Sequence, residues 1–220
     1  MKNSLLYSYQ FLRDVYDNMF SNKCNEDKIL KKYLKKKIIF FDIGYNLGFE
    51  TNKLKKKFSE RNLKIHAFEA NPALNKNIPT DINFNNLAIT SKKLPQVKFI
   101  IKNISSSSGL EKYVKKERND KIINVRTIKL SDYCKKNKIR LIDYMKIDVE
   151  GAELECLESL ENFIYKLRLL KIELTSKNFL KTIYYLDKKS FKFLGIINTK
   201  YVNNEFSCSN AFFINEKYKI

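Results

Sequence analysis

One short stretch near the start of the chain constrains the fold more than any other: an apolar run that leads into a loop with two glycines. Residues 38–41 read Ile-Ile-Phe-Phe, and the run continues through Asp42 and Ile43 to Gly44. Successive apolar residues of this kind indicate a strand buried on both faces, as strands of parallel sheets are. The pattern over residues 48–60 predicts a helix directly after the loop. This strand–loop–helix unit favours the α/β fold class.

Further strands and helices alternate along the rest of the chain. We expect strands at 65–69, 82–89, 141–148, 169–174, 191–197 and 207–214, and helices at 132–137, 152–163 and 177–188. Ser131 is expected to cap the helix that follows it. Residues 97–129 contain two more strand-like runs and are interpreted as a β insertion after the third strand. The alternation predicts a mostly parallel sheet with helices on both faces, closed by an antiparallel hairpin.

Two helices are expected before the first strand. Residues 4–20 carry apolar side chains at helical spacing, and residues 26–35 form a shorter helical pattern. A chain of 220 residues is expected to form one domain with some elaboration. We therefore divide it into an N-terminal helical extension, residues 1–37, and a single domain, residues 38–220.

The sequence predicts no transmembrane segment and favours a cytoplasmic protein. Uncharged apolar runs stay shorter than the roughly 18 residues of a spanning helix. Arg13, Asp14 and Asp17 interrupt the segment in which a signal peptide would be apolar. The four cysteines form no Cys-x-x-Cys pair, so neither a zinc site nor a disulfide framework is expected. The single histidine, His66, lies within an expected strand and is interpreted as a core residue.

The chain has a large excess of positive charge. Lys and Arg number 43 against 24 Asp and Glu, which gives a net charge of +19. A nucleic acid or an anionic surface would account for this excess. However, only six of the basic residues are Arg, the residue best suited to bidentate contacts with phosphate and guanine. The lysine bias therefore favours a solvated surface, and no specific nucleic-acid partner is expected.

The loop after the first strand suits a nucleoside ligand without a phosphate clamp. Gly44 and Gly48 are separated by three residues, among them Tyr45 and Asn46, a spacing that fits neither the dinucleotide fingerprint nor a P-loop. Gly44 permits a tight turn and the close approach of a ligand to the backbone. Asp42, at the end of the strand, is placed where a ligand's ammonium group could bind. The alternative is an ordinary turn whose glycines serve geometry alone.

The second strand ends in an acidic residue at the position expected for ribose recognition. Glu69 follows Gly48 by 21 positions. An acidic residue about 20 positions beyond a glycine loop accepts hydrogen bonds from ribose hydroxyls in nucleoside-binding folds. The loop and Glu69 together therefore favour a nucleoside ligand over a solvated strand end. Tyr45 and Phe49 flank the loop, and either stacking on the ligand or packing in the core would explain them.

A third set of candidates lies at the ends of two later strands. Strand alternation places Lys146 and Asp148 on one face, at the carboxyl end where parallel sheets bind ligands. Glu150 and Glu153 follow in the next turn, where Glu153 also suits a helix N-terminus. Glu173 ends the following strand. Asp148 and Glu150 are our candidates for a general base, with Lys146 and Glu173 as further catalytic candidates beside them.

Three segments together carry a family resemblance. They are residues 41–48 (FDIGYNLG), 67–72 (AFEANP) and 145–153 (MKIDVEGAE), of which the last is the most specific. In these segments the sequence resembles the FkbM family of S-adenosylmethionine-dependent methyltransferases. The likeness extends from about residue 38 to residue 214, and residues 1–37 lie outside it. Ala70 departs from the family, which commonly has proline at this position.

The resemblance implies a Rossmann-like class I methyltransferase fold of about seven strands that binds S-adenosyl-L-methionine. By likeness, Gly44, Asn46 and Gly48 would line the methionine part of the cofactor, and Glu69 its ribose. The segment with Leu87 and Ala88 would line the adenine. The other expected cofactor-binding residues are Asp42, Tyr45, Ala70 and Asp148. The family's usual activity would be O-methylation of a sugar or polyketide hydroxyl, often in glycan biosynthesis.

The sequence therefore favours an O-methyltransferase with a small-molecule or glycan substrate. A nucleic-acid methyltransferase is one alternative, supported by charge alone. A non-catalytic binding module that keeps the fold is another. The sequence leaves the acceptor and the oligomeric state open.

Two mechanisms are compatible with the acidic residues. In one, a carboxylate acts as the base and Lys146 offsets the excess negative charge. In the other, Asp148, Glu150 and Glu173 bind Mg²⁺, which lowers the pKa of the acceptor hydroxyl. The metal-free mechanism is favoured because the cation of Lys146 would repel a metal.

Overall fold

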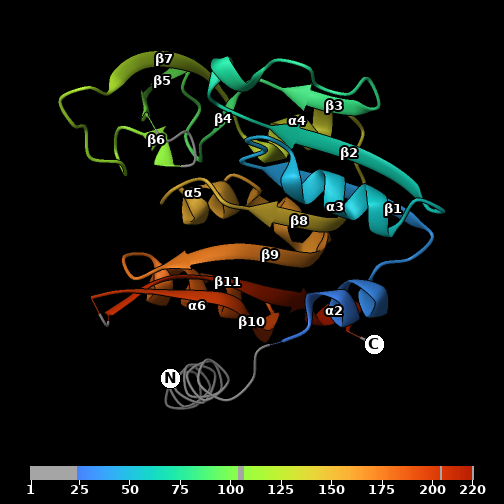
Figure 1. The fold of residues 1–220 in the computed structure, drawn as a ribbon. Helices are drawn as coiled ribbons and strands as arrows, with labels where there is room; N and C mark the ends of the chain where they lie inside the picture. The colour runs from blue at the N-terminus through green and yellow to red at the C-terminus, as the bar shows by residue number, and fades with distance from the viewer. Residues whose placement is uncertain (1–23, 104–106, 204, 220) are drawn as a thin grey trace.

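The computed structural model of the protein describes residues 24–103, 107–203 and 205–219. Within these residues, strands form a seven-stranded sheet in the order β10-β11-β9-β8-β1-β2-β3 and a four-stranded sheet in the order β4-β7-β5-β6 (Figure 1). The helix expected at residues 4–20 lies outside the described residues.

The centre of the large sheet is parallel. β1 (Lys37–Ile43) pairs with β2 (Asn62–Phe68) on one side and β8 (Ile142–Ile147) on the other. β3 (Ile82–Asn85) continues the sheet beyond β2, and β9 (Leu167–Thr175) continues it beyond β8. Because the chain builds the sheet outward in opposite directions from β1, the switch point lies between β1 and β8. The carboxyl ends of these two strands therefore border the crevice in which open α/β sheets bind ligands.

The expected antiparallel hairpin closes the other edge of the large sheet. β10 (Phe191–Val202) pairs with β11 (Glu205–Asn215), and β11 lies antiparallel beside β9. Both strands are longer than the sequence pattern predicted. The carboxyl end of β10 and the amino end of β11 extend past the carboxyl end of β9, so both reach the same crevice.

Helices cover both faces of the large sheet (Figure 1). α2 (Glu26–Tyr33) and α3 (Phe49–Lys57) pack on one face. α4 (Leu130–Lys136), α5 (Glu153–Glu158) and α6 (Phe179–Lys188) pack on the other. None of the helices in the described part of the chain has both the length and the apolar character needed to cross a membrane.

The apolar run of β1 is explained by these two layers. Phe41 and Ile43 pack in the core beneath α4, α5 and α6, whereas Ile38 and Phe40 pack beneath α2 and α3. Full burial of one such side chain stabilises the fold by about 1.5–3 kcal/mol. Residues of α2 belong to the same core, so the described end of the N-terminal extension packs directly on the domain.

The segment expected as a β insertion contributes to the second sheet. Its strands are β4 (Ala88–Ile89), β5 (Gln96–Ile101), β6 (Gly109–Leu110) and β7 (Lys121–Ile128). β5 runs antiparallel to β6 and β7, and β4 runs parallel to β7. The small core of this sheet includes Ala152, the residue before α5. The second sheet is thereby packed against the turn that follows β8.

The single strand expected at residues 82–89 is wrong: the chain forms β3 and β4, which belong to different sheets. Two asparagines explain the division. The side chain of Asn85 donates to the carbonyl of Ala67, and the N–H of Leu87 turns back to the carbonyl of Asn85. Asn86 then donates to the carbonyl of Glu69. These bonds end the pairing with β2 and direct the chain into the second sheet.

The helix expected at residues 152–163 is shorter than predicted. α5 ends at Glu158, where the hydroxyl of Ser159 donates to the carbonyl of Cys156 at 2.6 Å. Glu161 has a φ of 51°, which no α-helix allows, and a 3₁₀-helix, η3 (Glu161–Lys166), follows. Two shorter 3₁₀-helices are η1 (Pro72–Leu74) and η4 (Glu216–Tyr218).

The expected cap at Ser131 is also wrong. α4 begins two residues earlier than expected, at Leu130, and its N-cap is Lys129, whose side chain makes no capping bond. The N–H of Ser131 instead donates to the carbonyl of Ser159, so a neighbouring segment satisfies it. His66 is buried as expected, and its Nδ1 lies 2.7 Å from the hydroxyl of Tyr133.

Candidate active site

A cavity of about 870 Å³ opens at the carboxyl ends of β1, β2, β8 and β9 and is walled by both sheets. A volume of this size is ordinary for a small-molecule site. Most of the residues expected from the sequence line it: Gly44, Tyr45, Asn46, Glu69, Ala70, Leu87, Ala88, Lys146, Asp148, Glu150 and Glu173. Asp42 and Gly48 do not.

Gly44 is required by the close approach of two strand ends. Its φ is +80°, and a Cβ at this position would lie 1.9 Å from the backbone oxygen of Asp148. Gly48 has a different reason for being glycine: a Cβ there would lie 2.4 Å from the hydroxyl of Tyr45. Tyr45 is buried and packs edge-on against Phe84, with ring centroids 5.6 Å apart. Phe49 is exposed.

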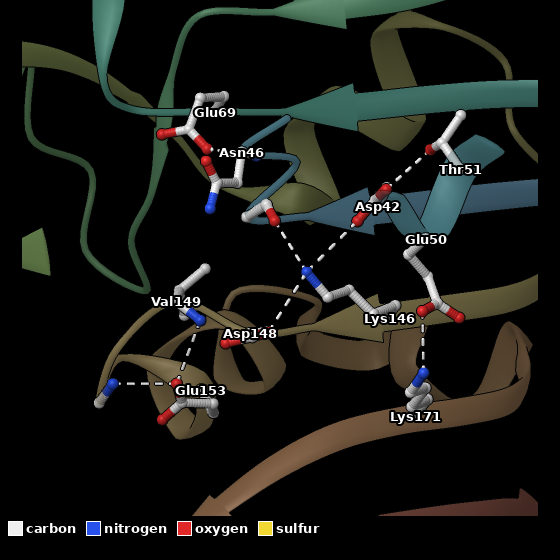
Figure 2. Close-up of polar contacts among 12 residues, drawn as sticks. Asp42, Asn46, Glu50, Thr51, Glu69, Lys146, Asp148, Val149, Glu153 and Lys171 are labelled. Carbon is white, nitrogen blue, oxygen red and sulfur yellow. Dashed lines mark hydrogen bonds and ion pairs between the residues drawn. The ribbon is translucent and has the colours of Figure 1, made fainter. Parts of the chain in front are cut away.

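Glu69 joins the glycine loop to the turn after β2. Its Oε2 accepts the N–H of Asn46 at 2.8 Å (Figure 2). Its Oε1 accepts the N–H of Asn71 at 2.8 Å. Burial raises the pKa of this carboxyl, while the hydrogen bonds from Asn71 and Asn46 oppose the rise. A carboxylate oxygen can accept more than one hydrogen bond, so acceptor capacity is left for a ligand in the cavity.

Lys146 is the centre of a buried polar network. Its Nζ donates to the carbonyl of Gly44 at 2.7 Å and lies 3.6 Å from a carboxylate oxygen of both Asp42 and Asp148 (Figure 2). Burial alone would lower the pKa of Lys146, but Asp42, Asp148 and Glu50 raise it above its ordinary value. The ammonium group therefore ties the glycine loop to the end of β8. The sequence predicted the proximity of Lys146 and Asp148 but not the bond to the loop.

Asp42 has a different place from the one expected. It is fully buried, and its Oδ2 accepts the hydroxyl of Thr51 at 2.7 Å. Lys146 is the cation beside Asp42. Asp42 itself does not line the cavity. Asp42 thus faces a cation supplied by the protein rather than a ligand's ammonium group. Burial raises its pKa, and Lys146 opposes the rise.

Three carboxyl groups gather on the floor of the cavity. One oxygen from each of Asp148, Glu150 and Glu173 can be chosen so that all lie within 4.8 Å of one another, a geometry that could also hold a metal ion. Burial, followed by the charges of Glu173, Asp148 and Glu153, raises the pKa of Glu150 to about 8. Burial also raises the pKa of Glu173. The cluster therefore retains a proton at neutral pH.

Glu153 braces the turn that carries Glu150. Its Oε1 accepts the N–H groups of Val149 and Gly151, and its Oε2 accepts the amide of Asn178 at 2.6 Å. The sequence predicted only that Glu153 is favourably placed at a helix N-terminus. The hydrogen bonds that close the turn before the helix are not visible in the residue pattern. Glu150 itself has a φ of 55°, so the brace holds it in a left-handed conformation.

The burial of Glu153 predicts a pH-dependent stability. Its pKa is raised to about 7, chiefly by burial, so its contribution to the free energy of unfolding is present below pH 4.5 and lost as the pH rises through 7. The expected loss between pH 5 and 8 is on the order of 2–3 kcal/mol. Denaturant unfolding of Glu153→Gln should show a flatter pH dependence than the unchanged chain. Glu158→Gln, on the exposed face of the same helix, is the control. An unchanged slope in Glu153→Gln would contradict this assignment.

The sequence missed the walls that the second sheet and the hairpin supply. Tyr113 lines the cavity, packs on Gly151 and donates to Glu155 of α5 at 2.6 Å. Lys200 and Cys208 line it from β10 and β11. These residues are distant in the chain from the recognised segments, and no local pattern places them. Residues 175–177 could have been predicted as part of the site, because they directly follow the strand expected at 169–174, which carries Glu173 at its end.

Comparison with protein-family models identifies the chain. The model described as the methyltransferase FkbM domain matches residues 42–193. The chain belongs to the FkbM methyltransferase family. The matched segment begins at the end of β1 and includes Glu69, the carboxylate cluster and β9. A search of curated proteins found no match.

A solved FkbM methyltransferase structure shares the fold of this FkbM-family chain. The methyltransferase FkbM of Methylobacillus flagellatus KT superposes with a TM-score of 0.53 at 13% identity. This match covers 89% of the present chain but 47% of that one, so the chain spans about half the length of this relative. Precorrin-6y C5,15-methyltransferase of Geobacter metallireducens GS-15 gives a TM-score of 0.46 at 12% identity over 86% and 87% of the two chains. An rRNA methylase of Streptococcus thermophilus gives 0.43 at 11% identity over 86% and 93%.

Proposed function

We propose that the protein is an S-adenosylmethionine-dependent O-methyltransferase that methylates a hydroxyl of a sugar, a glycan or a related natural product. One observation carries this proposal: a single cavity joins a nucleoside-type subsite, at Gly44 and Glu69, to a carboxylate cluster. Membership of the FkbM family supports methyl transfer. The proposal of a hydroxylated acceptor rests on the hydroxyl and carboxyl side chains that line the cavity.

The residues at the glycine loop fit the proposed cofactor. The side-chain oxygen of Asn46 is buried in the cavity wall and has no hydrogen-bond partner among the described residues. Gly44 leaves the backbone open to close approach, and Glu69 retains acceptor capacity for ribose hydroxyls. By family likeness, Leu87 and Ala88 would hold the adenine. When bound, the cofactor supplies a methyl group activated on a sulfonium.

Glu150 is the proposed general base. Its pKa of about 8 is close to neutral, where a carboxylate both accepts a proton readily and is present in useful amount. With the cofactor bound, Glu150 would take the proton of the acceptor hydroxyl, while the methyl group would pass from the sulfonium to the acceptor oxygen and leave the sulfur as the neutral thioether of S-adenosylhomocysteine. Lys146 and Asp148 hold the floor of the cavity in place. Asp148 remains the second candidate for the base, and Glu173 raises the proton affinity of Glu150.

The lining of the cavity also suits a polyhydroxylated acceptor. Hydroxyl side chains come to it from the second sheet and from the ends of β9 and β11: Ser107, Ser108, Tyr113, Thr175, Ser176 and Ser207. Hydroxyl groups can donate and accept, so they can pair with sugar hydroxyls in either sense. An apolar acceptor would use none of these hydroxyl groups.

We propose a metal-free mechanism, although Asp148, Glu150 and Glu173 could also bind Mg²⁺. Lys146 lies 3.6 Å from Asp148, and its charge would repel a divalent cation there. Turnover should therefore survive exhaustive treatment with EDTA and stay unchanged on addition of Mg²⁺. Activity that is lost to the chelator and restored by Mg²⁺ would overturn the metal-free mechanism and make Asp148 a ligand.

The proposed function is tested by following an isotopically labelled methyl group from S-adenosylmethionine into a panel of saccharides and mixed RNA. Labelled methyl ethers on a saccharide are expected. Labelled RNA, with binding that persists at about 200 mM salt, would instead support a nucleic-acid methyltransferase, which the +19 charge favours. Cofactor binding with no transfer to any acceptor would support the non-catalytic binding module.

A further inference from the structure

Three lysines without a carboxylate partner in the described part of the chain line the cavity. Lys115 follows β6 in the second sheet, Lys177 lies in the turn between β9 and α6, and Lys200 lies on β10. All three are exposed, and none forms an ion pair with another described residue. Lys102 and Lys146, which also line the cavity, are instead paired with carboxylates.

The cavity lining combines groups of opposite charge. The floor holds Asp148, Glu150 and Glu173. Lys200 lines the same cavity from β10, and its charge lowers the pKa of both Glu150 and Glu173 against the larger effect of burial. A ligand in the cavity would therefore meet both carboxyl groups and ammonium groups.

A neutral sugar would use only part of this arrangement. Its hydroxyls could pair with the serine and threonine side chains and reach Glu150, but the three lysines would stay solvated. A sugar with an attached anion could place that anion among the lysines while its free hydroxyl faced Glu150. The positive field of a chain with a net charge of +19 would also speed the approach of such an acceptor.

We propose that the acceptor is an anionic saccharide, a sugar that carries a phosphate or carboxylate group, and that Lys115, Lys177 and Lys200 bind its anionic group. This inference rests on the proposed function and narrows its substrate class. The shared chemistry is a negatively charged oxygen group at one end of the sugar and a hydroxyl at the other. The lysines act on binding of the acceptor.

The test compares two variants of equal charge. Lys115, Lys177 and Lys200 are replaced together by Gln in the first variant, and Lys31, Lys56 and Lys76, exposed lysines that do not line the cavity, in the second. Acceptors are hexose phosphates, nucleoside-diphosphate sugars, uronic acids and the neutral parent hexoses. Methyl transfer and the affinity for S-adenosylhomocysteine are both measured.

The unchanged protein should prefer an anionic saccharide over its neutral parent by at least about tenfold in kcat/KM. The cavity variant should raise KM for that acceptor by about 5- to 100-fold, with the affinity for S-adenosylhomocysteine unchanged. The control variant should change KM by less than about twofold. Comparison of kcat/KM for the sugar phosphates with kcat/KM for the uronic acids identifies whether the anionic group is a phosphate or a carboxylate.

Two results would overturn this inference and leave the proposed function intact: equal use of neutral and anionic saccharides, or an unchanged KM in the cavity variant. Methylation of RNA in place of every saccharide would overturn both. Methyl transfer to none of the saccharides, with S-adenosylhomocysteine still bound, would also overturn the saccharide acceptor and with it this inference.

Discussion

Replacing Glu150 by Gln is expected to lower turnover by about 10²–10⁴-fold and to leave the affinity for S-adenosylhomocysteine within about twofold. The amide keeps the size of the side chain but cannot take the proton of the acceptor hydroxyl. In the unchanged protein, the rate should rise with pH through about 8, because Glu150 must lose its own proton before it can act as a base. The variant should lose this rise.

The matched control for this variant is Glu117→Gln. Glu117 also lines the cavity, but it is exposed and pairs with Lys102 rather than with the carboxylate cluster. Its replacement should leave turnover nearly unchanged. If Glu150→Gln kept more than half of the turnover, the base would be Asp148, and Asp148→Asn would then show the large loss instead.

Replacing Gly44 by Ala is expected to remove measurable binding of S-adenosylhomocysteine, with a loss of at least about 100-fold. The new Cβ would lie 1.9 Å from the backbone oxygen of Asp148, so the end of β8 or the loop must move. The φ of +80° is also unfavourable for alanine. Strain and displacement together should lower the free energy of unfolding by about 2–4 kcal/mol.

Gly195→Ala is the control that separates the effect of backbone strain on stability from the effect of the glycine loop on cofactor binding. Gly195 also has a positive φ, and a Cβ there would lie 2.6 Å from the Cβ of Cys24, outside the cavity. This variant should lose stability but keep its affinity for S-adenosylhomocysteine. Both variants are measured by denaturant unfolding and by titration calorimetry at a temperature where each is folded. Normal affinity in folded Gly44→Ala would show that the loop does not contact the ligand.

The parallel core and the positions of the acidic residues were predictable because both depend on local patterns. A strand buried on both faces is apolar throughout, as β1 is, and the last residues of parallel strands meet at one edge. That rule brings Glu69, Asp148 and Glu173 to the same cavity without any knowledge of the fold's details. The family resemblance adds the identity of the expected cofactor, which local patterns alone leave as a nucleoside.

The rest of the site depends on contacts that local patterns do not encode. Asp42 was expected to face the ammonium group of a ligand, but the ammonium group of Lys146 lies beside it. Sequence spacing does not reveal whether a carboxylate meets a cation of the ligand or one of the protein. Glu153 is a turn brace because Asn178, from the loop before α6, reaches it. Tyr113 and Lys200 reach the cavity from segments whose packing is decided only when the second sheet and the hairpin are in place.

Titration calorimetry with S-adenosylhomocysteine tests the central claim most directly, because it asks whether this cavity is a cofactor site before any acceptor is known. The unchanged protein should bind one equivalent, and NADH should give no binding. Glu69→Ala should bind about five- to a hundredfold more weakly, because the carboxylate that pairs with the ribose hydroxyls is lost. Absence of binding to the unchanged protein, or equal affinity in Glu69→Ala, would contradict the account.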